Sequence, residues 1–221
     1  MKIVFLVERA TQFEAPFFRF AAGAPGHELR VLFTGAAPGA AVFDPELRQT
    51  ISWGMPLLDG YPHAVAPARG RARWLARQLR RGSCDLLIAN GYTRREYLLA
   101  AALARRAGIA TALRLESVLW QGPPTIPTQS PPAARRGVRL LAGRLLYSVL
   151  LPRLYDLFLG VGTLTLDYLD ACGVPAGRRG LFPYAVDVEH FRSRSCLAPA
   201  ERAAARARRG LGAGQQAVLA V

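Results

Sequence analysis

The chain has 221 residues, of which 51% are hydrophobic and 20% are charged, a globular balance that excludes a disordered or collagen-like protein. Its 29 Lys and Arg residues against 15 Asp and Glu residues give a net charge of +14. Every basic residue except Lys2 is an arginine, and a GC-rich coding sequence produces the same bias together with the many Ala, Gly and Pro residues. The charge is therefore only partly informative about binding partners.

The cysteines and the apolar runs indicate where the protein works. Cys84, Cys172 and Cys196 are far apart and form no CxxC pair, which excludes a disulfide framework and a zinc module and is typical of a reducing cytoplasm. The apolar run after Lys2 is too short for the core of a signal peptide. No apolar run reaches the roughly 18 residues that a membrane span needs. We therefore expect a soluble, cytoplasmic protein without a bound metal.

Short β-type apolar runs alternate with longer helical patterns along the chain. The patterns predict strands at residues 2–8, 28–34, 85–89, 109–116, 157–161 and 180–186, a weak strand at 49–53, and helices at residues 13–22, 71–81, 94–107, 133–155 and 163–172. Such alternation predicts βαβ units, and hence a doubly wound, Rossmann-like α/β fold with a parallel sheet of about six or seven strands. An Arg- and Ala-rich helix at 199–212 has no apolar stripe and is typical of a solvated linker.

Common site motifs are absent from the sequence. There is no GxGxxG after the first strand, no GxxxxGK(S/T), no GxSxG and no HExxH. These absences exclude the usual dinucleotide, P-loop, serine-hydrolase and zinc-protease sites, and we expect no cofactor.

In an open parallel sheet, ligands bind outside the carboxyl ends of the strands. The polar candidates at this edge are Gln12, Asn90, Tyr92, Arg114, Glu116, Thr163 and Asp187. Arg114 and Glu116 alternate on one strand and so point the same way, either as a binding pair or as a plain ion pair. Asn90 before Gly91 equally fits a turn, Thr163 a helix N-cap, and Asp187 a cap or a turn.

The last third of the chain carries Gly173-Val174-Pro175, then Phe182-Pro183-Tyr184-Ala185-Val186-Asp187, and then Phe191. This order resembles the closing segment of the N-terminal domain of retaining glycosyltransferases of family 4, which have the GT-B architecture. The opening strand and residues 53–61, 85–91 and 161–169 follow the order of that family as well. The resemblance covers residues 1 to about 192.

The resemblance implies the N-terminal half of a two-domain enzyme that moves a sugar from a nucleotide sugar to an acceptor, in cell-envelope polysaccharide synthesis. Residues 1–192 would hold the acceptor, 193–216 would form a linker helix, and 217–221 would begin a second domain that is missing here. That domain would bind most of the donor and carry the family's paired glutamates. The sequence departs from the family at residues 8–12, where a Gly-Gly loop is usual, and at 114–117, near which many members have a histidine.

We expect the acceptor to contact Asn90, Tyr92, Arg114 and Glu116, with Gln12, Thr163 and Asp187 as further contacts. Sugar hydroxyls both donate and accept hydrogen bonds, so amide, carboxylate and guanidinium groups can orient them, and Arg114 could bind an acceptor phosphate. Glu116 could position or deprotonate the attacking hydroxyl. The alternative is a non-enzymatic α/β module for a small polar ligand. Nucleic acid is disfavoured because the arginines are spread over many helices with few aromatic residues among them.

Residues 133–155 combine five arginines with many leucines. Such a helix can lie on an anionic membrane surface, here the inner face, which suits a lipid-linked sugar acceptor. It can equally pack on the sheet with its arginines at the rim, and the sequence leaves both interpretations open.

Overall fold

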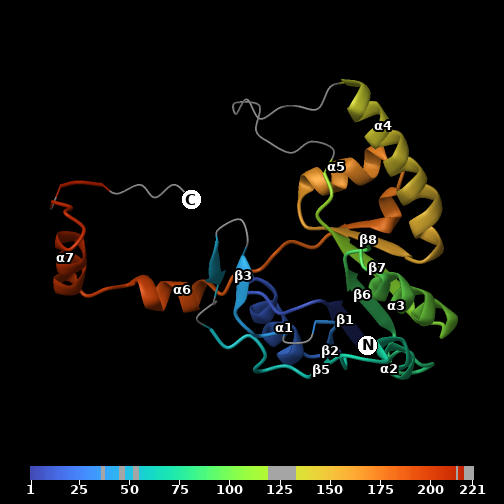
Figure 1. Cartoon of the computed structure of the whole chain (residues 1–221), viewed down its shortest axis with the longest axis horizontal. Coiled ribbons are helices and arrows are strands. Elements are labelled where there is room, and N and C mark those ends of the chain that lie inside the picture. The colour runs from blue at the N-terminus through green and yellow to red at the C-terminus, as the bar shows by residue number, and fades with distance from the viewer. Residues whose placement is uncertain (36–37, 45–47, 52–54, 119–132, 213, 217–221) are drawn as a thin grey trace. The chain divides into compact units, whose positions relative to one another are not determined.

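A computed structural model describes residues 1–35, 38–44, 48–51, 55–118, 133–212 and 214–216. At its centre lies a seven-stranded sheet in which every neighbouring pair of strands is parallel (Figure 1). In spatial order the strands are β5 (His63–Val65), β2 (Glu28–Phe33), β1 (Lys2–Val7), β6 (Leu86–Asn90), β7 (Ala110–Leu115), β8 (Leu157–Gly160) and β9 (Arg179–Leu181). The chain proceeds outward from β1 first to one side and then to the other, which confirms the doubly wound, Rossmann-like fold predicted from the sequence.

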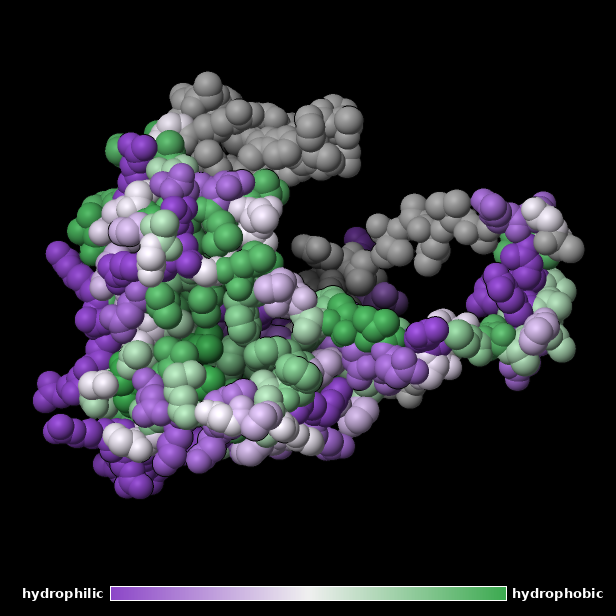
Figure 2. All heavy atoms as spheres, turned by 180° about the vertical axis from the view of Figure 1, so that it is seen from behind, coloured by the Kyte–Doolittle hydropathy of each residue, from purple (hydrophilic) through white to green (hydrophobic). Residues whose placement is uncertain are grey.

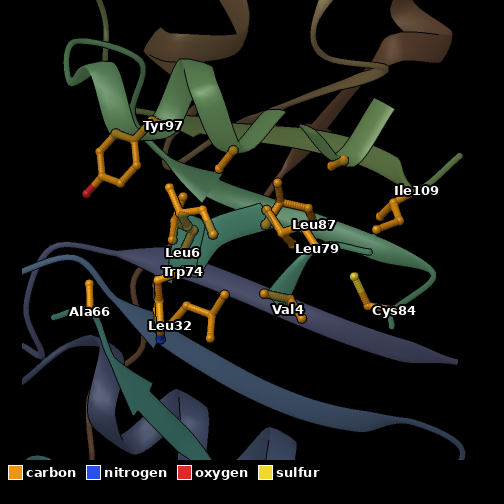
Figure 3. Packing of buried hydrophobic residues seen from close by; sticks show 13 residues of the cluster. Val4, Leu6, Leu32, Ala66, Trp74, Leu79, Cys84, Leu87, Tyr97 and Ile109 are labelled. Atoms are coloured by element: carbon orange, nitrogen blue, oxygen red, sulfur yellow. The ribbon is translucent and has the colours of Figure 1, made fainter. Parts of the chain in front are cut away.

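Helices cover both faces of the sheet because its strands are apolar on both sides. Along β1, Val4 and Leu6 belong to a core cluster with α2 (Arg71–Gln78) and α3 (Arg95–Arg106), whereas Phe5 and Val7 belong to a cluster with α1 (Glu14–Gly23). Figure 3 shows the first cluster, in which Trp74 and Leu79 approach Leu6, Leu32 and Leu87. A third cluster lies between the sheet, α3 and α5 (Thr163–Ala171).

The helix predicted at 133–155 is present as three consecutive helical segments. These are α4 (Ala133–Arg144), the π-helical η1 (Leu145–Leu150) and the 3-10 helix η2 (Leu151–Arg153). Pro152 has no N–H to donate and its ring collides with the preceding turn, so a regular α-helix cannot continue through it. No helix in the described part of the chain combines the length and the apolar content needed to cross a bilayer.

Gly143 sets how closely α4 approaches α5. A Cβ atom added to this glycine would lie 2.5 Å from the Tyr168 hydroxyl and 2.8 Å from the Cys172 Sγ. Gly137 lies in the same helix but has open space around it. The two glycines of α4 therefore differ in their packing.

The strand predicted at 49–53 does not join the central sheet. It is present as β4 (Gln49–Ile51), which pairs antiparallel with β3 (Val42–Asp44) in a separate two-stranded ribbon, and residues 52–53 lie outside the described part. The sequence prediction missed β5 because it is only three residues long and follows Pro62. A strand of this length leaves little periodic pattern to detect.

Two glycines shape the loops at the carboxyl edge of the sheet. The Gly35 N–H donates to the Glu8 carbonyl at 2.8 Å, and a Cβ added to Gly35 would lie 2.5 Å from that oxygen. Gly91 follows β6 with a φ of +113°, a backbone conformation that favours glycine. The connections that follow β1, β2 and β6 are therefore held in defined positions.

The chain divides into two compact units, residues 1–185 and 186–221. The second unit contains α6 (Val188–Ser195) and α7 (Pro199–Ala207), and none of its described residues is buried. The Asp187 carboxylate accepts from the His190 backbone N–H at 2.9 Å, so Asp187 is the N-cap of α6. The domain limits at 192 and 216 stay predictions, and the strand predicted at 217–221 lies outside the described residues.

Candidate functional site

A hollow of about 420 Å³ lies at the carboxyl edge of the sheet. The connections after β1 and β6, the end of β7 and the segment after β9 contribute its walls. It is lined by Glu8, Arg9, Thr11, Phe13, Glu14, Asn90, Tyr97, Glu116 and Tyr184. This is the edge at which parallel sheets bind ligands, and it brings together polar side chains from segments far apart in the sequence.

Glu14, in the first turn of α1, is at the centre of the hydrogen bonds around this hollow. Glu14 is only 5% exposed, and its Oε1 accepts a hydrogen bond from Asn90 Nδ2 at 2.6 Å. The same oxygen lies 3.5 Å from a guanidinium nitrogen of Arg114, and Oε2 accepts from the Thr11 hydroxyl at 3.2 Å. Donors therefore reach both carboxylate oxygens, as a buried carboxylate requires.

Arg114 is held on the same face of the sheet as Asn90. The two residues are partners in the register of β6 and β7, so their side chains leave the sheet side by side. The Arg114 Nε donates to the Phe182 carbonyl at 3.4 Å, and its guanidinium carbon lies 4.3 Å from the ring centre of Tyr184 and 5.1 Å from that of Phe182. Arg114 is 3% exposed and does not line the hollow, so it supports the site from behind.

Burial dominates the electrostatics of this pair. It raises the pKa of Glu14 above its ordinary value, and the opposing effects of the Arg114 guanidinium and the Thr11 hydroxyl do not cancel it. Burial likewise lowers the pKa of Arg114, against the attraction of Glu14 and Glu116. Both shifts express the cost of removing a charge from water, and each partner reduces that cost for the other.

Glu116 and two aromatic rings form the more accessible side of the hollow. Glu116 is exposed and accepts a hydrogen bond from the Tyr184 hydroxyl. The rings of Tyr184 and Phe13 are each 38% exposed, with centroids 5.5 Å apart. A carboxylate beside exposed aromatic faces is suited to a ring-shaped polyol, which offers hydroxyls at its edge and an apolar face.

The remaining wall is formed by the connection after β1. Glu8 makes an ion pair with Arg94 at 2.6 Å across the entrance to α3. Arg9 is exposed and lines the hollow, and it makes no ion pair with any residue that the structure describes. Tyr97 contributes a phenol to this wall, and burial raises its pKa to about 12.

Three of the predicted site residues, Asn90, Arg114 and Glu116, are brought together here. Tyr92 does not join them, because its ring packs against Tyr147 in the third core cluster. The Tyr147 hydroxyl lies 2.9 Å from both the Tyr92 hydroxyl and Ser117 Oγ. The structure thus ties Tyr92 to the core cluster and does not place it among the residues that line the hollow.

The other predicted contacts lie elsewhere. Gln12 is half-buried next to Thr11 but does not line the hollow. Thr163 is exposed at the first residue of α5, and the interpretation of Thr163 as an N-cap was wrong because Gly162 holds that position. Asp187 belongs to the second compact unit, where it caps α6. Its reading as a helix cap is confirmed.

The sequence prediction missed Glu14, Tyr97 and Tyr184. For Glu14 a local signal existed, because Thr11-x-x-Glu14 before an apolar run is the pattern of a capping box. The Thr11 hydroxyl accepts from the Glu14 backbone N–H at 3.3 Å, as that pattern predicts. No local pattern marks the buried Tyr97, and Tyr184 lies in the segment predicted as a strand at 180–186, whereas β9 ends at Leu181.

A second hollow of about 700 Å³ lies at the opposite, amino edge of the sheet. It is lined mainly by basic residues: Lys2, Arg30, Arg77, Gln78, Arg80, Arg81, Gly82 and Ser83. Arg77 lies in the last turn of α2, where a cation complements the helix dipole. The hydrogen-bonded and aromatic groups described above converge only on the carboxyl-edge hollow, which we take as the candidate site.

The described residues contain no group of three or more His, Cys, Asp or Glu side chains that could hold a metal ion. The polar groups of the candidate site are instead arranged as hydrogen-bond donors and acceptors. Two carboxylates, an amide, two hydroxyls and a guanidinium take part in these hydrogen bonds.

Comparison with known proteins gives the fold. No protein-family model and no curated protein matches the sequence. The crystal structure of HepE from Anabaena in complex with UDP-glucose matches with a TM-score of 0.54 at 15% identity, over 95% of this chain and 50% of that chain. HepE in complex with UDP matches with a TM-score of 0.52 at the same identity and coverage. A UDP-N-acetylglucosamine 2-epimerase from Rickettsia bellii reaches 0.49 at 13% identity, over 96% of this chain and 52% of its own.

The chain therefore spans about half the length of the solved structures that it matches. That share is what one Rossmann-like half of a GT-B architecture would give. At this level of identity the likeness extends to the fold and to nothing finer.

Proposed function

We propose that this chain is the acceptor-binding part of a glycosyltransferase that moves a sugar from a nucleotide-sugar donor to an acceptor. One observation carries the proposal: a hollow lined by carboxylates, an amide and exposed aromatic rings lies at the ligand-binding edge of a fold shared with HepE. The HepE crystal structures contain UDP, UDP-glucose, or UDP and glucose. We further propose retaining chemistry of the family 4 type, in the cytoplasm, for cell-envelope polysaccharide.

In this proposal the acceptor ring stacks on Tyr184 and Phe13 while its hydroxyls meet Glu116 and the free carbonyl side of Asn90. Glu116 is the candidate group for positioning or deprotonating the attacking hydroxyl, because it is exposed in the hollow and only its Oε1 is engaged by Tyr184. The donor would be bound mainly by residues outside this chain, and no cofactor is required.

Arg114 then has a positioning role. Its burial between two aromatic rings and its pairing with Glu14 leave it no access to an acceptor phosphate, contrary to the phosphate contact considered from the sequence. Through Glu14 it fixes Asn90, and through Tyr184 it fixes the ring beside Glu116. Removal of Arg114 would therefore disorder two contacts of the acceptor at once.

The test measures steady-state kinetics of the complete protein that the natural gene encodes. Glu116→Gln keeps the shape of the side chain and removes its charge, and Tyr184→Phe keeps the ring and removes the hydroxyl bonded to Glu116. We expect Glu116→Gln to raise the acceptor KM or to lower kcat by about 100-fold, with the donor KM little changed. Glu28→Gln, at the amino end of β2, is the matched control and should behave as wild type.

Wild-type acceptor kinetics in both site variants would contradict the assignment of the hollow as the acceptor site. The non-enzymatic alternative makes a different prediction. A protein that binds a small polar ligand in the hollow, loses that binding in Glu116→Gln, and neither transfers nor hydrolyses any nucleotide sugar would be a binding module.

A further inference from the structure

The outward face of α4 and η1 exposes a stripe of large apolar side chains. Val138 is 69% exposed, Leu141 70% and Leu145 56%, and Val149 and Leu150 are each 44% exposed. We define these five residues as the α4 stripe. Val138, Leu141, Leu145 and Val149 follow one another at intervals of three or four residues, which places these four on one side of the helical segment, and Leu150 directly follows Val149.

The inward face of the same segment is already buried. Tyr147 and Leu151 belong to the third core cluster, and Gly143 allows close contact with α5. Leu140 and Leu146 pack partly against that cluster. A helix that covers a core normally has a polar outer face, and one that is apolar on both sides indicates a second apolar environment.

The charge of the segment identifies the chemistry of that environment. Residues 117–155 contain five arginines, at positions 135, 136, 139, 144 and 153, and no Asp or Glu. Arg144 and Arg153 are exposed, and Arg144 also donates to the Ala171 carbonyl at 3.1 Å. A second copy of the chain would bring the same positive charge to the interface, which disfavours self-association through this face.

We propose that the α4 stripe docks onto an anionic lipid bilayer. Leucine and valine side chains would enter the boundary between headgroups and acyl chains, while the flanking arginines remain at the phosphate level. In Figure 2, green apolar residues reach the surface among purple hydrophilic ones at the upper left, the side on which α4 lies. This docking is independent of the proposed transfer reaction, because none of its residues lines the candidate site.

The experiment is flotation of the complete chain with vesicles of phosphatidylcholine, with and without phosphatidylglycerol. We expect binding only to the anionic vesicles, weakened by salt. The double variant Leu141→Ser, Leu145→Ser should lower the binding constant by about tenfold or more, since it removes the two most exposed leucines of the stripe. Arg153→Glu should lower it by at least about fivefold.

Two variants are matched controls for these changes. Phe20→Ser removes a side chain that is 77% exposed on α1, on the opposite face of the sheet, and should bind vesicles as wild type does. Arg69→Glu makes the same charge change at an exposed site before α2. All substituted side chains are exposed, so circular dichroism and melting temperature should stay unchanged.

Three results would overturn the proposal. The wild-type chain could remain unbound with anionic vesicles. Arg69→Glu could weaken binding as much as Arg153→Glu, with the leucine variant unchanged, which would assign the binding to the overall charge of +14. Sedimentation without lipid could reveal a dimer that the leucine variant abolishes, which would assign the stripe to a second copy.

Discussion

Replacing Arg114 by methionine should destabilise the first unit by about 3 kcal/mol or more at neutral pH. The Arg114 nitrogen lies 3.5 Å from Glu14 Oε1, with the side chains 4% and 6% exposed. At an effective dielectric constant of about 20, this separation corresponds to an attraction of about 5 kcal/mol. Removal of one partner of a buried pair typically costs about 3–5 kcal/mol, because the other charge stays buried. Methionine retains part of the contact with the two aromatic rings, so the lower end applies.

The loss should depend on pH. The pKa of Glu14 is already raised by burial in the folded protein, and loss of the guanidinium raises it further. A carboxyl with a raised folded pKa favours folding below that pKa, and this contribution disappears as the pH rises through it. The deficit of Arg114→Met should therefore be largest at neutral pH and shrink as the pH falls below the raised pKa that Glu14 has in the variant.

Urea unfolding followed by circular dichroism, at neutral and at mildly acidic pH, measures both effects. In a thermal scan at neutral pH, the melting temperature should fall by about 6–12 °C. Adding Glu14→Gln to Arg114→Met removes the unpaired carboxylate charge and should restore at least half of the lost stability. The reasoning is refuted if Arg114→Met costs less than about 1 kcal/mol, or if the double variant is no more stable than the single one.

Three further stability predictions follow from close approaches and hydrogen bonds in the structure. Gly35→Ala should destabilise the protein by about 1–3 kcal/mol, because the added Cβ would lie 2.5 Å from a carbonyl oxygen. Gly23 has open space around it, so Gly23→Ala should be neutral or stabilising. Equal melting temperatures of the two variants would contradict this prediction. Gly143→Ala should lower the melting temperature and Gly137→Ala, in the same helix, should raise it by helix propensity; the reverse order would contradict the packing against α5. Partial burial alone would raise the pKa of Asp156, but hydrogen bonds from a threonine and an arginine outweigh it and lower the pKa, so this carboxylate stabilises the fold above its ordinary pKa. That stability is lost as the pH falls through the folded pKa, and an acid titration of Asp156→Asn should lack this component.

The parts of the site that could be predicted from the sequence lie at strand ends. Asn90 and Arg114 are the last or nearly last residues of buried strands, and parallel pairing brings such positions to one edge. The same argument does not place Tyr92 in the hollow. Gly91, with a φ of +113°, breaks the alternation of the strand, so the next side chain is no longer directed by the period of two and packs into the core cluster.

The parts that could not be predicted depend on partners far along the chain. Glu14 contacts residues 76 and 100 positions away, and no local pattern specifies either contact. Only its capping motif with Thr11 was visible locally. The fold was more accessible than the site, because alternating strand and helix patterns appear along most of the chain, whereas the place of β4 in a separate ribbon is decided by pairing alone.

The separation of Glu14 and Arg114 in the sequence has a consequence for folding during synthesis. The ribosome adds about 5–20 residues per second, so Arg114 emerges roughly 5–20 s after Glu14. During that interval the first βα unit has no guanidinium to pair with the Glu14 carboxylate. Packing of the hydrophobic face of α1 onto the sheet would then bury an unpaired charge. Completion of this core is therefore unfavourable before β7 is synthesised. Premature termination upstream of β7 should yield fragments that proteases degrade readily.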